Sequence, residues 1–318
     1  MMLISWSGYL ITSDSTARLH VFIAQNAPTA AILRQGPSKQ VLLIKWNLND
    51  DSFEYGQWFK GRIYEDQCDI SPNGTKFIYF ASKFIPPFKR EEDPYHSPLS
   101  RWTAISKPPY FTAIALWAQQ ANSAGGGFFE SEKKIILNHA PNEMELSPGF
   151  SVPSNTTILS YGDKTGWSWV DAILKPKWLR DGWRQLQDGK KYTSENFNDS
   201  TYIQSPNQDP EMQKIFEMIH NEQCTFADHF YYIYSPPLLY SKTKRFGPGK
   251  EISLIMQIYG KDQKGKIIYY QIEDTKTKQK IPLGRLNWSD WDKNGDLIFT
   301  KQGRLYRLKP DVTKSKTF

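Results

Sequence analysis

Cysteine and long apolar segments are scarce in this chain. Of its 318 residues only Cys68 and Cys224 are cysteine, and no CxxC or Cys/His spacing accompanies them. A disulfide framework or a zinc site of the usual spacing is therefore not expected. No apolar run is long enough to span a bilayer, and residues 1–10 lack the basic and apolar regions of a signal peptide. We expect a cytoplasmic protein without membrane segments.

The common catalytic and nucleotide-binding motifs are also missing. The sequence has no GxGxxG, GxxxxGK[ST], HExxH or GxSxG motif and no EF-hand loop. The run HNEQCTFADH, from His220 to His229, admits a Cys-His or metal cluster, but a polar loop after a helix explains it more simply. The chain also has two Asp-rich turns, one with Asp50 and Asp51 and one with Asp290, Asp292 and Asp296. Neither matches the spacing of calcium ligands, and hairpin turns favour Asp for local hydrogen bonds. We predict no catalytic residue, metal ligand or cofactor.

Aromatic residues are plentiful, at 14% of the chain, which suits an amphipathic sheet protein better than a disordered one. The formal charge of +7 is unevenly spread. Residues 241–318 hold 18 Lys and Arg against 8 Asp and Glu, which leaves −3 for residues 1–240. Such a basic segment is typical of proteins that bind acidic partners or nucleic acids. Lysines on solvated strand faces and edges explain the same count of charges.

The sequence near the end of the chain predicts a series of short strands. Residues 267–272 and 281–286 are β-rich runs on either side of a polar turn, which predicts a hairpin. The run NWSDWD at 287–292 follows. Strands are then predicted at 296–300 and 304–308, with Asn-Gly and Gln-Gly turns that supply positive φ cheaply.

Residues 41–81 repeat this order of parts. Strand-like runs at 41–46 and 53–58 precede the turn DISPNG at 69–74, and a hydrophobic run at 75–81 follows it. Both segments place an Asp shortly before an Asn-Gly turn and a strand, which indicates repeats of one supersecondary element. Weaker strand-like runs lie at 102–105, 110–117, 128–138, 156–161 and 252–258. Counting outwards gives about five units of four strands.

Two stretches depart from the strand pattern. Asp209 and Pro210 are typical of a helix start, and apolar residues at helical spacing continue to Ile219, so a short helix is predicted there. Residues 167–184 are either a helical insertion broken near Pro176 or two irregular strands. We predict a single domain over 1–318, with insertions near 140–184 and 205–225 and a frayed tail at 311–318.

The turn DISPNG before a strand resembles the D-x-S-P-D/N-G turn of WD40-like and TolB-like β-propellers. The ending from Asn287 to Arg307 also resembles the last blade of an uncharacterised group of bacterial propeller-like proteins. Together these segments cover about a quarter of the chain. The resemblance implies an all-β fold, a β-propeller of about five four-stranded blades with short helical insertions. A closed ring would pair an N-terminal strand, for which we choose Leu19–Ala24, with the last blade.

An aromatic and basic segment is the candidate functional surface. Trp and Arg dominate protein–protein hot spots, and they also stack on unpaired bases. A structural role is the alternative, in which the same tryptophans fill the propeller core or the interfaces between blades. The candidate partner-binding residues are Trp167, Trp169, Trp178, Arg180, Trp183 and Arg184.

These observations predict a non-catalytic protein–protein interaction or regulatory module, a scaffold in a bacterial multiprotein system of the defence or signalling kind. One alternative is a hydrolase with carboxylates in the propeller channel, supplied by different blades. Another is nucleic-acid binding through the basic C-terminal quarter, with an affinity that falls steeply with salt. A protein partner is expected ahead of a nucleic acid.

Overall fold

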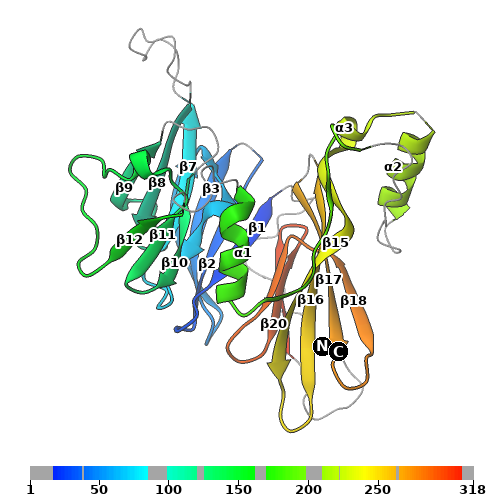
Figure 1. Ribbon diagram of the computed structural model, residues 1–318. Helices are drawn as coiled ribbons and strands as arrows, with labels where there is room; N and C mark the ends of the chain where they lie inside the picture. The colour runs from blue at the N-terminus through cyan, green and yellow to red at the C-terminus, as the bar shows by residue number, and fades with distance from the viewer. Residues whose placement is uncertain are drawn as a thin grey trace. The chain divides into compact units, whose positions relative to one another are not determined.

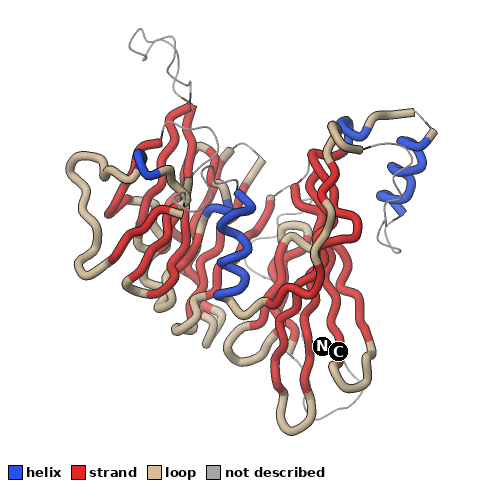
Figure 2. Tube along the Cα trace, viewed as in Figure 1, coloured by secondary structure: helices blue, strands red, loops and turns tan. Residues whose placement is uncertain are grey.

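The computed structural model describes residues 17–37, 39–84, 99–119, 125–161, 170–197, 210–221, 223–262 and 265–309. Strands dominate these ranges and helices are few (Figures 1 and 2). Five sheets follow one another along the chain, which confirms the predicted all-β, propeller-like fold of about five sheet units. The units are less regular than four-stranded blades, because the described sheets contain between three and six strands.

The chain divides into two compact units. The N-terminal unit contains described residues 17–181 and 302–304, and the C-terminal unit contains 182–301 and 305–309. The N-terminal unit holds three of the sheets, and the C-terminal unit is built around the other two. No helix in the ranges described combines the length and the apolar character needed to cross a membrane.

The first sheet is an antiparallel meander in the order β1-β2-β3-β4. Its strands are β1 (Arg18–Ile23), β2 (Thr29–Gln35), β3 (Gln40–Asn47) and β4 (Ser52–Lys60). The predicted strands at 41–46 and 53–58 are thus confirmed. The predicted pairing of Leu19–Ala24 with the last blade is wrong, because among the described residues β1 is an edge strand that pairs with β2 alone, from Arg18↔Gln35 to Ile23↔Ala30, and the strands at 288–308 form a separate sheet. A short link joins these two strands, so their pairing costs far less loop entropy than pairing with strands near residue 300.

The other described residues of the N-terminal unit form two further sheets and one helix. The second sheet contains β5 (Arg62–Ile63), β6 (Asp69–Ile70), β7 (Phe77–Phe84), β8 (Leu99–Ser106) and β9 (Ala113–Gln119). The third contains β10 (Gly127–Ser131), β11 (Lys134–Leu137) and β12 (Thr157–Ser160), which runs parallel to β11. Short 3-10 turns form at Glu65–Gln67 and Pro141–Glu143.

The helix α1 (Val170–Arg180) settles the described part of the stretch 167–184. It is helical, and Pro176 lies inside the helix without ending it. The chain then leaves α1 and enters the strand β13 (Arg184–Gln187) of the C-terminal unit. The two alternatives for this stretch are therefore resolved in favour of the helix.

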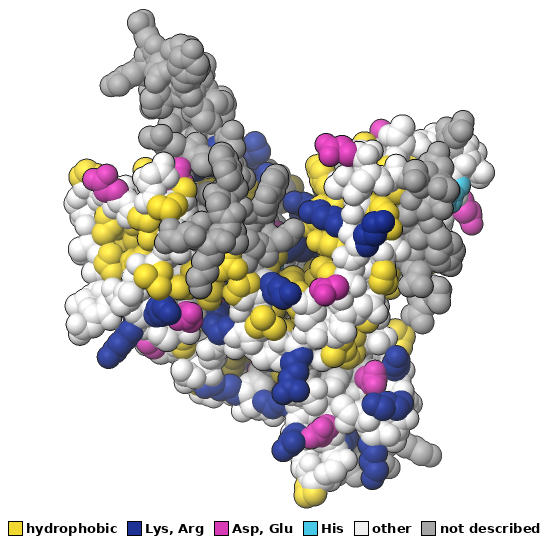
Figure 3. Space-filling model, in the orientation of Figure 1, with side chains coloured by type: hydrophobic (Ala, Val, Ile, Leu, Met, Phe, Trp, Pro, Cys, Tyr) yellow, Lys and Arg dark blue, Asp and Glu magenta, His cyan; other side chains and the backbone are white. Residues whose placement is uncertain are grey.

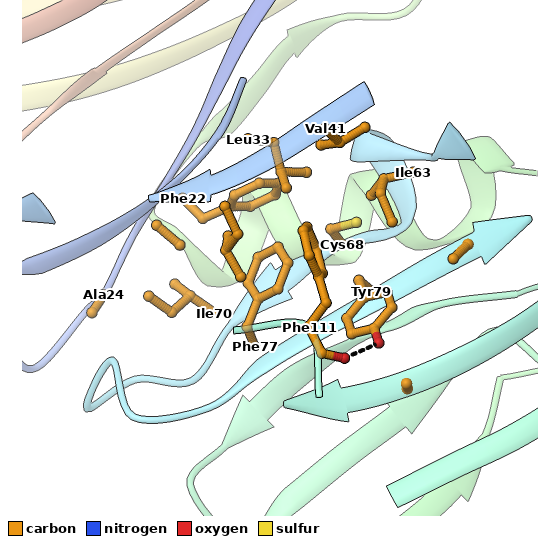
Figure 4. Packing of buried hydrophobic residues seen from close by; sticks show 14 residues of the cluster. Phe22, Ala24, Leu33, Val41, Ile63, Cys68, Ile70, Phe77, Tyr79 and Phe111 are labelled. Atoms are coloured by element: carbon orange, nitrogen blue, oxygen red, sulfur yellow. Dashed lines mark hydrogen bonds between the residues drawn. The ribbon is translucent and has the colours of Figure 1, made fainter. Parts of the chain in front are cut away.

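The core of the N-terminal unit lies between its successive sheets. Phe22 and Leu33 of the first sheet pack in one cluster with Phe77 and Tyr79 of β7 (Figure 4). The neighbouring residue Ile78 belongs to a second cluster, which joins the second sheet to the third. Because successive side chains of a strand point to opposite faces, β7 is buried on both faces. This explains why its sequence FIYFA is a continuous hydrophobic run rather than an alternating one.

The described residues of the C-terminal unit form one long sheet, one short sheet and two helices. The long sheet is formed by β13, β14 (Lys191–Tyr192), β15 (Phe230–Arg245), β16 (Glu251–Asp262), β17 (Gly265–Asp274) and β18 (Lys280–Arg285). The short sheet has β19 (Trp288–Trp291), β20 (Leu297–Lys301) and β21 (Arg304–Leu308). The predicted hairpin at 267–286 is confirmed as β17–β18.

The predicted helix after Asp209 is confirmed as α2 (Pro210–His220), and α3 (Phe226–His229) follows it. The apolar face of α2 packs on the long sheet, where Met212 and Phe216 share a cluster with Ile233 and Ile267. The cluster therefore attaches α2 to β15 and β17 of the same unit.

The glycines before β10 allow very close packing. Gly126 has φ of +74°, and a Cβ at this position would lie 2.0 Å from the carbonyl oxygen of Gln67. Its N–H donates to Oγ1 of Thr103 at 2.7 Å. Gly149 has a similar φ of +84°, but a Cβ there would meet nothing within 4 Å. Substitutions at these two glycines therefore distinguish the effect of a steric clash from the effect of backbone strain.

Gly126→Ala is expected to lower the free energy of unfolding by about 3 kcal/mol, because it adds an overlap with the backbone to the left-handed strain. Gly149→Ala carries only the backbone strain and is expected to cost about 1 kcal/mol. Urea denaturation of both variants measures the difference. Equal losses would contradict the close packing around Gly126.

Candidate functional site

The six predicted partner-binding residues fall in different environments. Trp167 and Trp169 lie outside the described residues. Trp178 is half-buried on α1, and Trp183 is buried with 4% of its surface exposed. Arg184 is exposed at the start of β13. Partner binding by these residues stays a prediction, and Trp183 matches the core-filling explanation given for the tryptophans.

Arg180 binds the first residue of the DISPNG turn. Its Nη1 and Nη2 donate to the two carboxylate oxygens of Asp69, at 2.5 and 3.0 Å, and Nη1 also donates to the Phe129 carbonyl at 2.6 Å. Oδ2 of Asp69 accepts the N–H of Phe129 at 2.8 Å. Burial opposes the charge of Arg180, but the nearby Asp69 carboxylate outweighs it and raises the pKa of Arg180. The guanidinium therefore clamps α1 to β6 and β10.

Lys177 adds a second attachment one turn earlier on α1. Its Nζ donates to the carbonyl oxygens of Cys68, at 2.5 Å, and Asp66, at 3.4 Å, and lies 5.6 Å from the ring centroid of Phe22. Burial lowers the pKa of Lys177, and the Asp69 carboxylate opposes this shift. Burial also raises the pKa of the Cys68 thiol, so it is a poor nucleophile. These groups hold the helix in place.

The second Asp and Asn-Gly segment has the same local geometry. The N–H of Gly74 donates to the Ser71 carbonyl at 2.8 Å, and the N–H of Gly295 donates to the Asp292 carbonyl at 3.2 Å. Both glycines have positive φ, of 74° and 86°. Asp290, two residues before its turn, pairs with Lys242 at 2.7 Å, just as Asp69 pairs with Arg180. The two repeated sequence segments therefore form the same arrangement, an Asn-Gly turn preceded by an Asp in an ion pair.

Two carboxylates also lie close together in the C-terminal unit. Nη1 of Arg307 contacts Oδ2 of Asp292 at 2.5 Å and Oδ2 of Asp296 at 2.8 Å. The remaining oxygen of Asp292 accepts the N–H of Asp296 at 2.8 Å. A shared arginine and a backbone N–H are contacts that stabilise a turn, rather than the two free carboxylates of a glycoside hydrolase. The hydrolase alternative stays a prediction.

His139 is buried beside Thr103 in the N-terminal unit. Its Nε2 lies 2.8 Å from Thr103 Oγ1, and its Nδ1 lies 3.0 Å from the Glu143 carbonyl oxygen. Thr103 Oγ1 also accepts the N–H of Gly126. Burial lowers the pKa of His139 to about 4. Both the hydroxyl and the imidazole are fully buried, so this pair supports the fold and does not face a substrate.

The described side chains between His220 and His229 make structural contacts. Asp228 caps α3 by accepting the N–H of Thr225 at 2.7 Å, and Cys224 packs against the cluster beneath α2. Nowhere in the described ranges do three or more His, Cys, Asp or Glu side chains gather as metal ligands. The simpler explanation of this run, a polar link after a helix, fits its position between α2 and β15.

Three exposed aromatic rings lie around β4. The exposed fractions of Tyr55, Trp58 and Tyr110 are 55%, 53% and 51%. The loop that carries Tyr110 is bonded to β4, because the N–H of Gln57 donates to the Pro109 carbonyl at 3.0 Å and Gln57 Oε1 accepts the N–H of Phe111 at 2.9 Å. We call Tyr55, Trp58 and Tyr110 the aromatic surface.

Irregular strand pairing explains why sequence reasoning missed this surface. Residues three apart on a regular strand point to opposite faces. In β4 the register shifts between the pairs Leu42↔Trp58 and Ile44↔Tyr55, so both aromatic residues share one face with Leu42 and Ile44. A Gly between two aromatic residues, as at Gly56, was the signal available in the sequence, because Gly in a strand often marks a bulge.

Comparisons with known proteins add little to this site. No protein-family model and no curated protein matches the chain. A solved structure of an uncharacterised protein from Listeria monocytogenes is similar at 9% identity with a TM-score of 0.32, covering 96% of this chain and 98% of that one. The candidate site therefore depends on the residues themselves.

Arg180→Ala is expected to lower the free energy of unfolding by about 3–5 kcal/mol, because it leaves the Asp69 carboxylate buried and unpaired. Arg184→Ala, four residues later, removes the same charge from an exposed position and is expected to change stability by at most about 0.5 kcal/mol. Chemical denaturation checks both. Similar effects of the two substitutions would contradict the clamp.

Acid is expected to destabilise the fold through His139. In the unfolded chain this group titrates near its ordinary value of 6.5, and in the folded chain at about 4. Between these values the unfolded state holds more protons, so stability is full above pH 6.5 and falls by about 3 kcal/mol towards pH 4. Denaturation of the protein and of His139→Gln at pH 7, 5.5 and 4 isolates this contribution.

The exposed His220 provides the control, since His220→Gln is expected to keep the acid loss of the unsubstituted protein. A His139→Gln variant that loses stability with acid as steeply as the unsubstituted protein would show that His139 is not the group responsible.

Proposed function

We propose that this chain is a non-catalytic interaction module, a propeller-like scaffold of the WD40-like or TolB-like kind that binds a protein partner. The observation that carries the proposal is the aromatic surface. Tyr and Trp are the side chains that most often dominate protein–protein binding energy. Tyr55 and Trp58 share one face of β4, and Tyr110 lies on the loop that is hydrogen-bonded to this strand; each ring is more than half exposed.

The residues beside Tyr55 and Trp58 on the same face are well packed, which supports an ordered binding surface. The apolar residues opposite Tyr55 and Trp58 on β3, Ile44 and Leu42, are 4% and 6% exposed. Phe53 on the same strand stacks on the buried Trp46 at 5.5 Å between ring centroids. Binding to a surface that is already ordered loses less conformational entropy, which favours a stable complex.

Charge around the aromatic surface favours an acidic partner. Lys39, Lys60 and Arg62 are exposed near the end of β4, and the N–H of Gly61 donates to the Lys39 carbonyl at 2.8 Å. The acidic residue Glu54 already pairs with Lys45 at 3.9 Å. A partner with acidic residues beside an apolar patch complements this arrangement and associates faster at low salt.

The buried ionisable groups support a role without chemistry. Arg180, Lys177 and His139 each contact a structural partner, as described above. In this proposal the protein acts in the bacterial cytoplasm, without a cofactor, within a multiprotein assembly of the defence or signalling kind. Two further candidate partner-binding residues are the half-buried Trp178 on α1 and the exposed Arg184 on β13.

Affinity purification of the tagged protein from its host, with nuclease present, is expected to recover a stoichiometric protein partner. Trp58→Ala is expected to weaken this complex by at least tenfold, about the effect of losing one hot-spot residue. Tyr231→Ala removes a ring of similar exposure, 61%, from the C-terminal unit and is expected to leave the complex intact.

Circular dichroism and thermal unfolding of both variants show whether the fold is retained. Recovery of the same partner by folded Trp58→Ala at unchanged affinity would reject the aromatic surface as the binding site. Failure to recover any protein partner would reject the interaction module itself.

A further inference from the structure

One face of the long sheet in the C-terminal unit combines tyrosine and lysine side chains. Tyr232 on β15 lies directly opposite Lys261 on β16, which lies opposite Lys266 on β17. Directly paired residues of antiparallel strands point to the same face. Tyr234, two residues after Tyr232, lies opposite Lys191 on β14. These five residues therefore share one face across four strands.

Tyr231 joins the same group. The register shifts between Phe230 and Tyr232, which leaves Tyr231 in a bulge opposite Lys261. The Lys261 ammonium lies 5.7 Å from the Tyr231 ring centroid, and the Lys191 ammonium lies 4.2 Å from that of Tyr232. The Tyr231 ring is 61% exposed. We call Lys191, Tyr231, Tyr232, Tyr234, Lys261 and Lys266 the Lys-Tyr face.

The opposite face of these strands is occupied by core. Ile233, between Tyr232 and Tyr234, packs with Ile267 and the α2 residues Met212 and Phe216. The Lys-Tyr face is therefore not required to bury the helices. In Figure 3, Lys and Arg side chains lie beside hydrophobic ones on the part of the C-terminal unit below α3.

The charge on the Lys-Tyr face is concentrated. Lys261 and Lys266 are direct cross-strand neighbours, and like charges at such positions repel. The two adjacent ammonium groups lie on the same face as the three tyrosine rings, an arrangement that suits a ligand with negative charge and flat apolar groups.

We propose that the Lys-Tyr face binds single-stranded nucleic acid. Proteins that bind single strands combine cations that contact phosphates with aromatic rings on which unpaired bases stack. The Lys-Tyr face supplies three tyrosines on β15, with Lys191 on the neighbouring strand β14 and Lys261 and Lys266 on β16 and β17. This activity goes beyond the protein-partner proposal and uses residues of the other unit.

The tyrosines distinguish a single strand from other anions. In a duplex the bases are stacked on one another, so the rings have nothing to stack on and only the lysines contribute. An acidic peptide likewise depends on the lysines. A contribution from the Tyr231 ring, with preference for a single strand, is therefore the signature of the proposed ligand.

Fluorescence anisotropy of the full chain with a labelled oligo(dT) strand tests the proposal. Binding is expected at low salt, with a slope of log affinity against log salt of about −2 for three phosphate contacts. Tyr231→Ala is expected to weaken binding by about tenfold without changing this slope. The double variant Lys261→Gln/Lys266→Gln is expected to reduce the slope by about 1.4.

The matched control is Lys276→Gln/Lys278→Gln, which removes two charges from the exposed turn between β17 and β18. It is expected to keep the affinity of the unsubstituted protein within about twofold, since these lysines lie outside the face. Equal weakening by both double variants would show diffuse attraction to the basic C-terminal quarter and overturn the proposal. So would a duplex that binds as tightly as the single strand, no binding at low salt, or unchanged binding by Tyr231→Ala.

The two functional proposals can be tested independently of each other. Trp58→Ala is expected to leave oligo(dT) binding unchanged, whereas Tyr231→Ala is expected to leave the protein complex unchanged. Loss of both activities in a folded Trp58→Ala variant would contradict the assignment of two independent surfaces.

Discussion

The ion pair between Asp69 and Arg180 is the constraint on which the N-terminal unit depends. A buried charge is tolerated only when it is paired and hydrogen-bonded, and here both carboxylate oxygens contact the guanidinium. The pair joins residues 111 positions apart and brings α1 against the turn that precedes β7. Lys177 extends the same attachment to the carbonyls of Asp66 and Cys68. The helix thereby covers the third sheet through Ile173.

The C-terminal unit repeats this solution with different residues. Lys242 holds Asp290, and Arg307 joins Asp292 to Asp296 around the Asn-Gly turn. In both units buried charged groups are used to hold turns and strands together. Both functional proposals concern surfaces, the aromatic surface around β4 and the Lys-Tyr face of the long sheet.

The sequence predicted the parts of the fold that depend on local patterns. The Asn-Gly turns, the hairpin at β17–β18 and the helix α2 were found because glycine, alternation and helix caps leave signals within a few residues. The neighbour of β1 was predicted wrongly, since strand pairing depends on two segments and leaves no signal within either one. The propeller resemblance favoured pairing with the last blade, which would close the ring. Pro176 inside α1 was ambiguous, because packing through Ile173, Lys177 and Arg180 holds the helix despite a missing hydrogen bond.

The candidate site was less predictable than the fold. Trp183 and Arg180 were selected by residue type, but burial and a distant carboxylate determine what they contact, and neither is visible in a single sequence. Tyr55 and Trp58 were overlooked because only the register shift in β4 places them on one face. Exposure is set by tertiary structure, so an aromatic residue in a strand predicts a core position first.

Hydrogen exchange on the complex purified from the host tests the central claim most directly. The account predicts that the partner slows exchange in residues 52–60 and 107–111, which carry the aromatic surface. Slower exchange confined to α1 and β13 would contradict the account, because it would place the partner on the tryptophan and arginine segment instead.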